Sequence, residues 1–501
     1  MSRGFDLVVI GGGSAGCVVA ARASEEAARQ VLLVEAGPDP QPVPDVIADP
    51  ARQAELVAGD TYVRTLPAQR PDGSTYPLVA GRVMGGGSSV NNLAAVRPTI
   101  ADFDAWSDVG GPAWSFERLL PTLRAMETDA DFPDDPLHGA TGPLRLVRRF
   151  QVDGPREPIV GALLEAGAGL GLPACRDLNG REPFGIGAST YGEVDGRRQS
   201  VAAAYLDPVR GRPNLTIRAA TSAVRLRLAG SHVTAVELRG PSGQEVVEAD
   251  RFVLSAGVFG SPQLLVSSGI GPTETLDRLG LPVALPLAGV GRGYRDHAVI
   301  FLAFEAGPKL RSDEPIPKAR VVARSDGRRE PPDLHLLIRG PKRGPGGGLH
   351  LPVSVHLLDH RARGALTFVS PDGAAVPEVR TALLQHPDDI GALEAGVELA
   401  CRLAASPSLA PLYGQPLLPA GVDARQSHIL AHFGTYHHGV GTCALGRDGD
   451  PLAVVDGGLR VRGLENLWVA DASVLPTIPR ANTNLAAVMI GEMATQALQG
   501  R

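Results

Sequence analysis

Short apolar runs alternate with a stretch of helical spacing at the start of this chain. Residues 7–10 and 31–34 are continuous apolar runs of the length typical of buried parallel strands. Between them, small residues continue at helical periodicity through Ala28. The order strand, helix, strand within about thirty residues predicts a βαβ unit.

The same kind of pattern returns later in the chain. An apolar run at 252–254 leads into Ser255-Ala256-Gly257, and another at 467–470 leads into Asp471 and a helix expected from about Asn484. Residues 299–436 differ, because their strand-like runs are separated by polar and Gly/Pro-rich loops, which is typical of an antiparallel sheet. These runs are residues 300–304, 334–338, 351–358 and 366–369.

These patterns predict an α/β protein (α+β overall) with two interleaved domains. A chain of 501 residues is too long for one core. We expect a doubly wound nucleotide-binding domain from residues 1–150, 208–298 and 437–501, and a substrate domain on the antiparallel sheet from 151–207 and 299–436. Residues 38–78 show little periodicity and predict a long surface excursion. Helices are expected within 102–127, 155–172 and 390–405.

Gly11, Gly13 and Gly16 follow the first predicted strand at G-x-G-x-x-G spacing. Gly11 permits the tight turn, Gly13 lets a pyrophosphate approach the backbone, and Gly16 lets the helix pack close to the strand. Glu35 ends the second strand, where a carboxylate can accept hydrogen bonds from ribose hydroxyls. This arrangement predicts a dinucleotide site with phosphates at the helix N-terminus. The alternative is a glycine-rich turn that binds nothing.

Composition and charge narrow the choice of function. A hydrophobic content of 44% is typical of a soluble protein, and no apolar run is long enough to span a membrane. The net charge of −6 gives no electrostatic reason to expect nucleic acid as a partner. Because the first strand begins almost at once, we expect no signal peptide and a cytoplasmic location. The four cysteines are far apart and form no C-x-x-C pair, so we expect reduced thiols.

A glycine-rich segment, residues 81–92 (GRVMGGGSSVNN), is costly to order unless a ligand or backbone comes close. It offers backbone N–H groups and side-chain amides to a phosphate or a flat polar ring. A flexible loop is the alternative, but the neighbouring Arg82 and Asn92 favour a ligand contact.

Several motifs together carry a resemblance to a known family. They are GGGSAG at 11–16, GRVMGGGSSVNN at 81–92, DFDAW and PAWSFERLLP within 102–121, SAGVFGSPQLLVSSGIGP at 255–272, GVGRGYRDH at 289–297, HGVGTCALG at 438–446, and DASVLPTIPRANTNLAAVMIGE from Asp471. With these residues the chain resembles the glucose–methanol–choline (GMC) oxidoreductases, a flavoprotein family, from about Phe5 to Leu498. The number, order and spacing of the motifs make the resemblance specific.

The resemblance implies FAD as the cofactor. The residues that it places along FAD are Gly11, Gly13, Ser14, Ala15, Gly16, Glu35, Ala36, Arg82, Gly86, Ser89, Asn91, Asn92, Val224, Ala256, Gly257, Asp471, Ala472, Asn482 and Thr483. Glu35 would bind the adenosine ribose, and Val224 the adenine through its backbone. Some members of the family bond the flavin to a histidine where this chain has Val90, so we expect non-covalent FAD.

The resemblance also implies a catalytic pair, His438 and Asn482. A histidine suits proton abstraction because its ordinary pKa lies near 6.5, and Asn482 would hold the substrate oxygen. The alternatives are a buried histidine bonded to backbone and an asparagine that caps a helix. For the neighbouring His437 a structural role leads, with a substrate contact as the alternative, and His297 is expected to be structural.

Some positions depart from the family pattern. The family's proline after the catalytic histidine is Gly439 here, so we expect a looser loop, and the asparagine of its GRN-like motif is Gly293. His356 and His360 stand at H-x-x-x-H spacing, but no acid completes a ligand set, and we expect no metal site. The segment RGPKRGPGGG at 339–348 predicts a solvated connection, with a lid as the alternative.

The predicted function is FAD-dependent oxidation of the CH–OH group of a small alcohol, in which His438 takes the proton and flavin N5 the hydride. Oxygen, a quinone or another carrier could accept the electrons, so an oxidase and a dehydrogenase both stay open. Aromatic residues make up only 4% of the chain, which disfavours a cage for choline. The alternatives on the same fold are a hydroxynitrile lyase and a light-driven decarboxylase. An FAD-stabilised binding protein is disfavoured by the intact His438–Asn482 pair.

Overall fold

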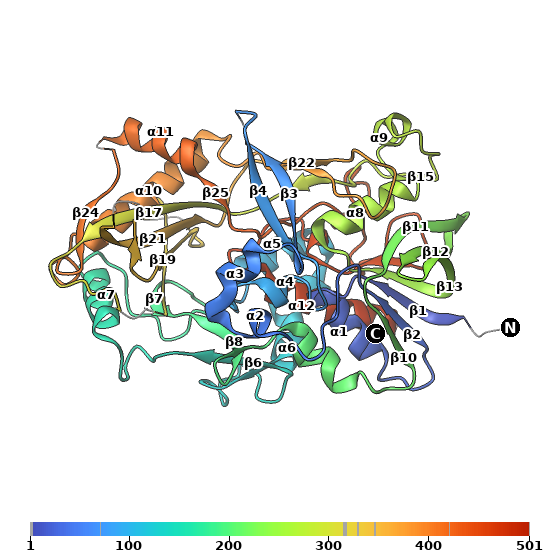
Figure 1. Cartoon of the computed structure of the whole chain (residues 1–501), viewed down its shortest axis with the longest axis horizontal. Helices are drawn as coiled ribbons and strands as arrows, with labels where there is room; N and C mark the ends of the chain where they lie inside the picture. The colour runs from blue at the N-terminus through green and yellow to red at the C-terminus, as the bar shows by residue number, and fades with distance from the viewer. Residues whose placement is uncertain are drawn as a thin grey trace.

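The computed structural model describes residues 4–70, 72–313, 318–327, 330–344, 347–419 and 421–499. Its first strand, β1 (Phe5–Ile10), lies inside a parallel sheet, between β2 (Val31–Val34) and β13 (Gly243–Leu254). Strand β10 (Leu215–Arg218) extends this sheet beyond β2, and β26 (Leu467–Val469) extends it beyond β13. The sheet lies on the right in Figure 1, with both termini near it.

The carboxyl ends of these parallel strands meet at one edge of the sheet. Ile10 is level with Val34 on one side and with Leu254 on the other, and Leu254 is level with Val469. The segments that follow these strands therefore start side by side, which is the edge where open α/β sheets bind ligands. The apolar runs became strands here because both faces of the sheet are covered: all four residues of β2 are buried.

Helices α1 (Ser14–Ala23) and α12 (Thr483–Leu498), the first and last long helices, pack together beside this sheet. A Cβ at Gly491 of α12 would lie 2.8 Å from the carbonyl oxygen of Ala15 and from Cβ of Val18. The absence of a side chain at Gly491 therefore allows the close approach of the two helices. The first half of β13 leaves the parallel sheet and forms an antiparallel extension with β12 (His232–Gly240) and β11 (Ser222–Ala229).

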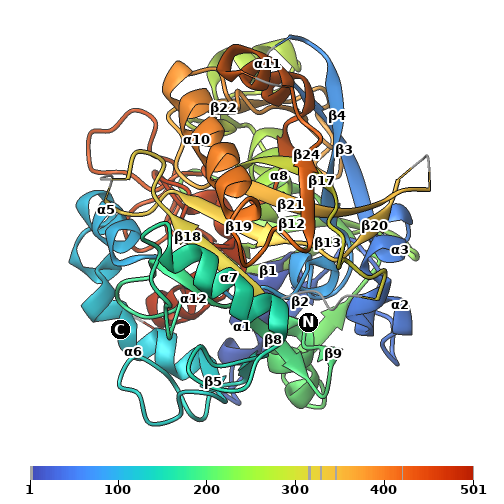
Figure 2. The same cartoon turned by 90° about the vertical axis from the view of Figure 1, so that its left-hand side faces the viewer.

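A second, antiparallel sheet occupies the opposite end of the molecule, on the left in Figure 1. Its main order is β24 (Tyr413–Pro416), β17 (Ala298–Ala306), β21 (Leu349–Leu357), β19 (Leu334–Ile338), β18 (Ala319–Ala323) and β7 (Gly185–Ala188), with β25 (Gly434–Thr435) on β17 and β20 (Lys342–Arg343) on β21. One face is apolar: Val321, Leu336 and Val355 pack in one cluster with Leu393 and Val397 of helix α10 (Pro387–Ala404). Figure 2 shows α10 lying across this sheet.

Two smaller sheets join segments that are distant in sequence. One has the order β16 (Arg292–Tyr294), β22 (Gly364–Thr367), β23 (Glu378–Arg380), β3 (Val63–Gln69) and β4 (Thr75–Gly81). The other has the order β5 (Glu127–Asp129), β6 (Leu144–Arg148), β8 (Thr190–Val194) and β9 (Arg197–Arg198). The short β14 (Ile270–Gly271) and β15 (Leu285–Pro286) pair with each other.

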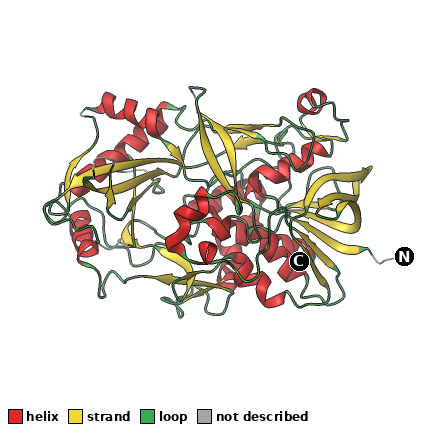
Figure 3. Ribbon diagram, viewed as in Figure 1, coloured by secondary structure: helices red, strands yellow, loops and turns green. Residues whose placement is uncertain are grey.

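The remaining helices lie mainly between the two large sheets or at the surface (Figure 3). They are α2 (Asp45–Ala48), α3 (Gln53–Ala58), α4 (Gly87–Val90), α5 (Ile100–Gly110), α6 (Phe116–Met126), α7 (Pro158–Ala168), α8 (Gly257–Ser267), α9 (Thr273–Arg278) and α11 (Val422–His432). The 3-10 turns are Pro50–Arg52, Pro112–Trp114, Asp207–Val209 and Ala472–Val474, and Ala202–Leu206 is a π-helical turn. Among the described helices, none is both long and apolar enough to cross a membrane.

The predicted helices at 102–127, 155–172 and 390–405 are confirmed as α5 and α6, α7 and α10. The segment 38–78, predicted as a long surface excursion, contains α2, α3 and most of the hairpin of β3 and β4. The prolines that interrupt both strands account for the weak periodicity of the sequence here. The prediction that the run at 366–369 lies in the antiparallel sheet of the second domain is wrong. It forms β22, which pairs through β23 with that hairpin.

The structure confirms the prediction for the cysteines and leaves the domain boundaries open. The four cysteines are free thiols, as expected, with Cys17 and Cys443 buried. Two large hydrophobic clusters exist, one around the parallel sheet and one around the antiparallel sheet. The domain boundaries stay a prediction, and the position of β22 places residues near 364–380 with the first cluster.

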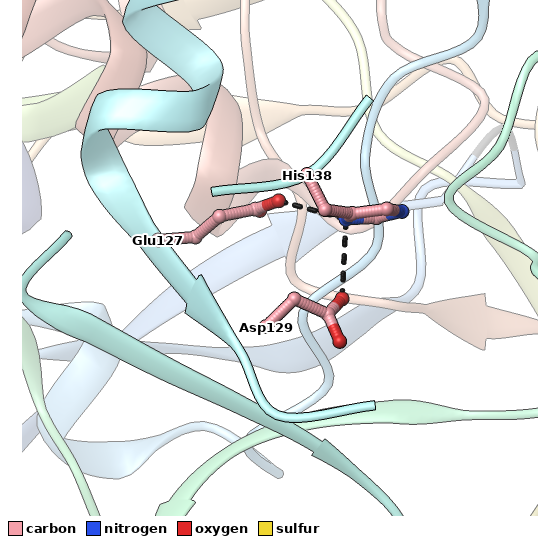
Figure 4. A group of neighbouring side chains, drawn as sticks. All are labelled: Glu127, Asp129 and His138. Atoms are coloured by element: carbon pink, nitrogen blue, oxygen red, sulfur yellow. Dashed lines mark hydrogen bonds and ion pairs between the residues drawn. The ribbon is translucent and has the colours of Figure 1, made fainter. Parts of the chain in front are cut away.

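A buried group of charges holds the region after α6 together. His138 contacts Glu127 (Nδ1 to Oε1, 2.8 Å), Asp129 (Nδ1 to Oδ2, 3.1 Å) and Asp177 (Nε2 to Oδ2, 2.9 Å). Figure 4 shows both Glu127 and Asp129 pointing at the His138 ring. Burial lowers the pKa of His138, but the carboxylates of Asp177 and Glu127 outweigh burial and raise it to about 9.

Glu127, Asp129 and His138 are close enough to resemble a metal-ligand set, and nothing in the sequence pattern singled them out. Two arginines already occupy the carboxylates: Arg97 lies 2.8 Å from Glu127, and Arg148 lies 2.8 Å from Asp129. With His138 protonated, it and the two arginines face the carboxylates of Glu127, Asp129 and Asp177. The group is therefore satisfied as an ion-pair network, in which a metal ion would have to displace a proton and compete with guanidinium groups.

The raised pKa of His138 makes stability depend on pH. A group whose folded-state pKa lies above its ordinary value of 6.5 adds stability that is complete below pH 6.5 and is lost as pH rises through about 9. We expect this group to contribute up to about 3 kcal/mol. The melting temperature of the wild type should fall between pH 7 and pH 10. The melting temperature of His138→Gln should be lower than that of the wild type at pH 7 and should change little over that range. His232→Gln, at an exposed histidine, is the control; equal pH slopes in wild type and His138→Gln would contradict the assignment.

Candidate active site

The three glycines after β1 are required for different reasons. Gly11 has φ +106°, and a Cβ there would lie 2.4 Å from the carbonyl oxygen of Ser255. A Cβ at Gly16 would lie 1.9 Å from the carbonyl oxygen of Gly11, so Gly16 allows helix and strand to touch. At Gly13 the nearest atom to such a Cβ is 3.8 Å away. Gly13 therefore leaves an open cradle at the start of α1, which is where a phosphate group fits.

Several helix N-termini converge on this cradle. Ser14, the first residue of α1, donates from Oγ to Oδ1 of Asn484 in α12 (2.9 Å). Gly86 precedes the short α4, and a Cβ there would lie 2.7 Å from Cα of Gly13. Neither α1 nor α12 has a side-chain cap on its first turn, so their backbone N–H groups are available to a ligand. This fits an anionic pyrophosphate.

Glu35 lies at the end of β2, as predicted, and is buried. Its two carboxylate oxygens accept hydrogen bonds from the backbone N–H groups of Gly12 (2.8 Å) and Gly37 (2.7 Å). Burial raises its pKa, although these two bonds act in the opposite direction. Each oxygen keeps a second lone pair for a ribose hydroxyl, so Glu35 can shape the loop and bind a ribose together. Ala36 follows directly and accepts from Arg82 (3.3 Å).

The segment 81–92 is ordered through contacts with other parts of the chain. Ser89 donates to the carbonyl of Met84 (2.7 Å), and Asn91 accepts from Arg198 (2.9 Å), while Asn92 is exposed. Val90 packs in a small cluster with Ile47, Leu56, Val63 and Val83. Its side chain offers no atom that can bond covalently to a flavin, and non-covalent FAD stays a prediction.

The predicted residues after the other strands gather at the same edge. Asp471, after β26, accepts hydrogen bonds from the N–H of Gly257 (2.9 Å) and from Ser261 (2.5 Å), so it holds the start of α8, next to Ala256. Ala472 follows Asp471, and Thr483 is the first residue of α12. Val224 lies at an irregularity of β11, outside the regular ladder, where a backbone group can face a ligand; its carbonyl accepts from Gly373 (3.2 Å).

The structure brings His438 and Asn482 together, although 44 residues separate them. Nδ2 of Asn482 lies 3.2 Å from Nε2 of His438. Asn482 is the N-cap residue of α12 by position, but its side chain makes no capping hydrogen bond. Its amide instead contacts His438 on one side and, through Oδ1, Nη1 of Arg320 on the other (3.2 Å). The helix-cap alternative for this side chain is therefore excluded.

His297 contacts the other edge of the His438 ring. The two Nδ1 atoms are 2.9 Å apart, and Nε2 of His297 lies 3.0 Å from the carbonyl oxygen of Pro479. Burial lowers the pKa of His297 to about 3, so its ring is neutral. A carbonyl accepts only, so His297 carries its proton on Nε2 and accepts at Nδ1.

This order of donors determines the tautomer of His438. Because His297 accepts at Nδ1, His438 must donate from Nδ1. Burial, then His297 and His356, hold the pKa of His438 well below its usual range, so this ring is also neutral. Its Nε2 therefore carries a lone pair, toward Asn482. His438 is half-buried, and this lone pair, which accepts from the amide of Asn482, is where the ring can take up a proton.

Backbone contacts hold the loop that carries His438. The N–H of His438 donates to Asp296 (2.9 Å), and Val440 exchanges two backbone hydrogen bonds with Arg295. A Cβ at Gly439 would lie 2.8 Å from the ring of Tyr294, so glycine makes room for that tyrosine, and the looser loop stays a prediction. His437 has φ +62°, and its Nδ1 accepts from the N–H of Val79 (3.3 Å), in line with a structural role.

Two residues at this site were not predicted. His297 was expected to be structural, yet it touches the ring of His438; its place in the RDH motif was a usable signal. Arg320 of β18 was not considered at all, because a single arginine in an apolar strand-like run carries no sequence signal. His356 bonds to Ser354 (3.0 Å) and packs on Tyr436, and with His360 it belongs to no group of three ligands among the described residues.

The fold and the site define an FAD-dependent alcohol oxidoreductase. Two family models, both described as GMC oxidoreductase, match residues 5–299 and 360–491. The chain belongs to this family.

Individual relatives agree with this assignment. The chain is 34% identical to 5-(hydroxymethyl)furfural oxidase of Methylovorus sp. (99% of this chain, 98% of the relative). It is also 34% identical to pyridoxine 4-oxidase of Microbacterium luteolum (98% and 99%). The crystal structure of a pyridoxine 4-oxidase from Mesorbium loti superposes with a TM-score of 0.91 at 30% identity, covering 99% of both chains.

The surroundings of Gly13 and Gly16 predict different effects for the same substitution by alanine. Gly13→Ala should leave the fold intact and reduce FAD loading, because its Cβ enters an open cradle. Gly16→Ala should destabilise the protein with or without FAD, because its Cβ meets a backbone oxygen at 1.9 Å. The flavin-to-protein absorbance ratio and the melting temperature of the apoprotein separate the two. A normal FAD content in Gly13→Ala would place the phosphates elsewhere.

The contact between His297 and His438 predicts a positioning role. His297→Leu should lower kcat by at least about tenfold with little change in FAD content, because Nδ1 of His438 loses its acceptor. His297→Gln should recover part of this loss, since its amide can accept from His438 and donate to Pro479. His432→Gln, at an exposed histidine of α11, is the control. Equal losses for the leucine and glutamine variants would indicate packing alone.

Proposed function

We propose that His438 removes the hydroxyl proton of an alcohol while Asn482 binds the alcohol oxygen. The observation that supports this most directly is the hydrogen-bond order at His438, which leaves the lone pair on Nε2 beside the amide of Asn482. An alcohol oxygen placed between the two groups donates its proton to Nε2 and accepts from Nδ2 of Asn482. Both interactions strengthen as the oxygen gains negative charge.

The environment of His438 suits a base. When its ring gains a proton, Nδ1–H keeps its hydrogen bond to His297, so only one new bond is made. The buried guanidinium of Arg320 lies against the other side of Asn482 and favours negative charge on the alcohol oxygen. The same positive charge disfavours a protonated His438 at rest.

FAD is the cofactor of the family, and when bound it supplies the hydride acceptor for the carbinol carbon. The cradle at Gly13 would hold its phosphates, Glu35 its ribose, and the segment around Asp471 its flavin end. The contacts of these residues support this placement, since the strand ends that carry them share one edge of the sheet.

The names of relatives support alcohols as substrates and oxygen as one electron acceptor. The two relatives described above are named oxidases of a hydroxymethyl compound and of pyridoxine. A dehydrogenase that uses a quinone or another carrier stays the alternative, and oxygen consumption during turnover separates the two. A cytoplasmic location stays a prediction.

Flavin reduction tests the proposal directly. Anaerobic addition of an alcohol such as benzyl alcohol should bleach the flavin absorbance of the holoprotein. His438→Ala should slow this step on the order of 10²- to 10⁴-fold while FAD stays bound. Because the pKa of His438 is lowered, the base is neutral at neutral pH, and kcat/KM should fall only below the ordinary value of 6.5.

Two outcomes would contradict the proposal. Near-normal flavin reduction in His438→Ala would remove the proposed base. Product formation from a cyanohydrin or a fatty acid with the flavin oxidised at the end of turnover, and no bleaching by alcohols, would favour the lyase or the decarboxylase alternative. His437→Gln, at the adjacent histidine that binds backbone, tests whether the effect is specific to position 438.

A further inference from the structure

Arg320 is a buried cation beside the proposed base. It lies in β18, and its side chain is 1% exposed. Its Nη1 contacts two neutral acceptors, Nδ1 of His335 (2.8 Å) and Oδ1 of Asn482 (3.2 Å). Its Nε has no hydrogen-bond partner in the part of the chain that the structure describes. The buried Nε atoms of Arg97, Arg148 and Arg480 also lack a partner among the described residues, so Arg320 differs from these arginines in the partners of its other nitrogens.

Other buried arginines show what such a partner normally is. Arg97 and Arg148 each bind a carboxylate at 2.8 Å, and Arg480 binds Asp102 at 2.8 Å and Asp359 at 2.7 Å. Arg198 and Arg295 lack a carboxylate but donate to backbone carbonyls. Among the described residues, Arg320 has neither a carboxylate nor a backbone carbonyl as a partner.

The strand face around Arg320 is polar and basic. His335 is level with His356 across β19 and β21, and with Val322, two residues beyond Arg320, across β18. These residues therefore share one face of the sheet, opposite the face that packs on α10. His356 is buried, and its Nδ1 has no partner among the described residues. Arg339 adds a second positive charge that acts on both Arg320 and His356.

The position of Arg320 relative to His438 indicates what it can bind. One asparagine side chain bridges the two, so an anion on Arg320 lies next to the reacting oxygen. A cavity of about 10 Å³ that Arg320 and His335 share with Arg97 and Arg480 holds at most one water molecule. This cavity is therefore too small for a substrate carboxylate, and the proposal below places the carboxylate on the Asn482 side of Arg320.

We propose that Arg320 binds a carboxylate of the substrate, and that the enzyme oxidises hydroxy acids, with the carboxylate close to the reacting hydroxyl group. This inference rests on the proposed alcohol oxidation and specifies its substrate class. A carboxylate pairs with a guanidinium through charge-assisted hydrogen bonds, and it would give Arg320 the acidic partner that it lacks among the described residues. The same charge disfavours a cationic alcohol such as choline, which would have to approach an unscreened buried cation.

Substrate pairs test the charge preference. We would compare glycolate and mandelate with their uncharged amides, and add benzyl alcohol and choline. At least one carboxylate should exceed its amide in kcat/KM by roughly tenfold or more, and choline should be the poorest substrate. If every amide equals or exceeds its acid while benzyl alcohol still bleaches the flavin, the inference is wrong although alcohol oxidation stands.

Binding without turnover separates the two proposals. Calorimetry with the holoprotein should show benzoate binding at least about tenfold tighter than benzamide, a difference that Arg320→Gln removes and Arg320→Lys partly keeps. Arg425→Gln, which breaks an ion pair with Glu394 on the far helices, is the matched control. Equal binding of benzoate and benzamide by the wild type, or an unchanged preference in Arg320→Gln, overturns the role of Arg320, whether or not any alcohol is oxidised.

Discussion

The close contact between the first and last helices is the constraint on which the site depends. Gly491 lets α12 approach α1 at the level of Ala15, and Ser14 bonds to Asn484 at the starts of the two helices. This contact brings Asn482 to the edge of the sheet where Gly13 opens its cradle. If α12 were moved outward by a side chain at position 491, Asn482 would move away from the cradle at Gly13.

A chain of hydrogen bonds crosses the site from the carbonyl of Pro479 to the guanidinium of Arg320. Between these two ends, His297, His438 and Asn482 each have one donor and one acceptor position in use, so a single arrangement of protons satisfies all of them. These two ends thus determine which nitrogen of His438 carries the lone pair. Three separate segments of the chain and a strand of the antiparallel sheet contribute to this line, which explains why neither half of the molecule could hold it alone.

The glycine motif could be recognised in the sequence, whereas the roles of several buried charged residues could not. The spacing of Gly11, Gly13 and Gly16 predicted a strand, a helix and a second strand, and β1, α1 and β2 confirm these three elements, while the dinucleotide site stays a prediction. Arg320 and the hairpin of β3 and β4 depend on partners more than a hundred residues away, so their neighbours in sequence give no sign of their role. Glu127, Asp129 and His138 also gave no sign in the sequence, because the arginines that balance their charges, Arg97 and Arg148, lie on separate segments.

By itself, the sequence determined the βαβ unit and the family, because short-range spacing and ordered motifs encode them, and the resemblance to that family named His438 and Asn482 as a pair. Tertiary structure alone decided that Asn482 does not cap its helix, that His297 sets the tautomer of His438, and that an arginine without an acidic partner stands beside both. These are properties of contacts between distant segments. A hydrogen bond has a direction and a partner only once the chain has folded, so no pattern along the sequence could specify them.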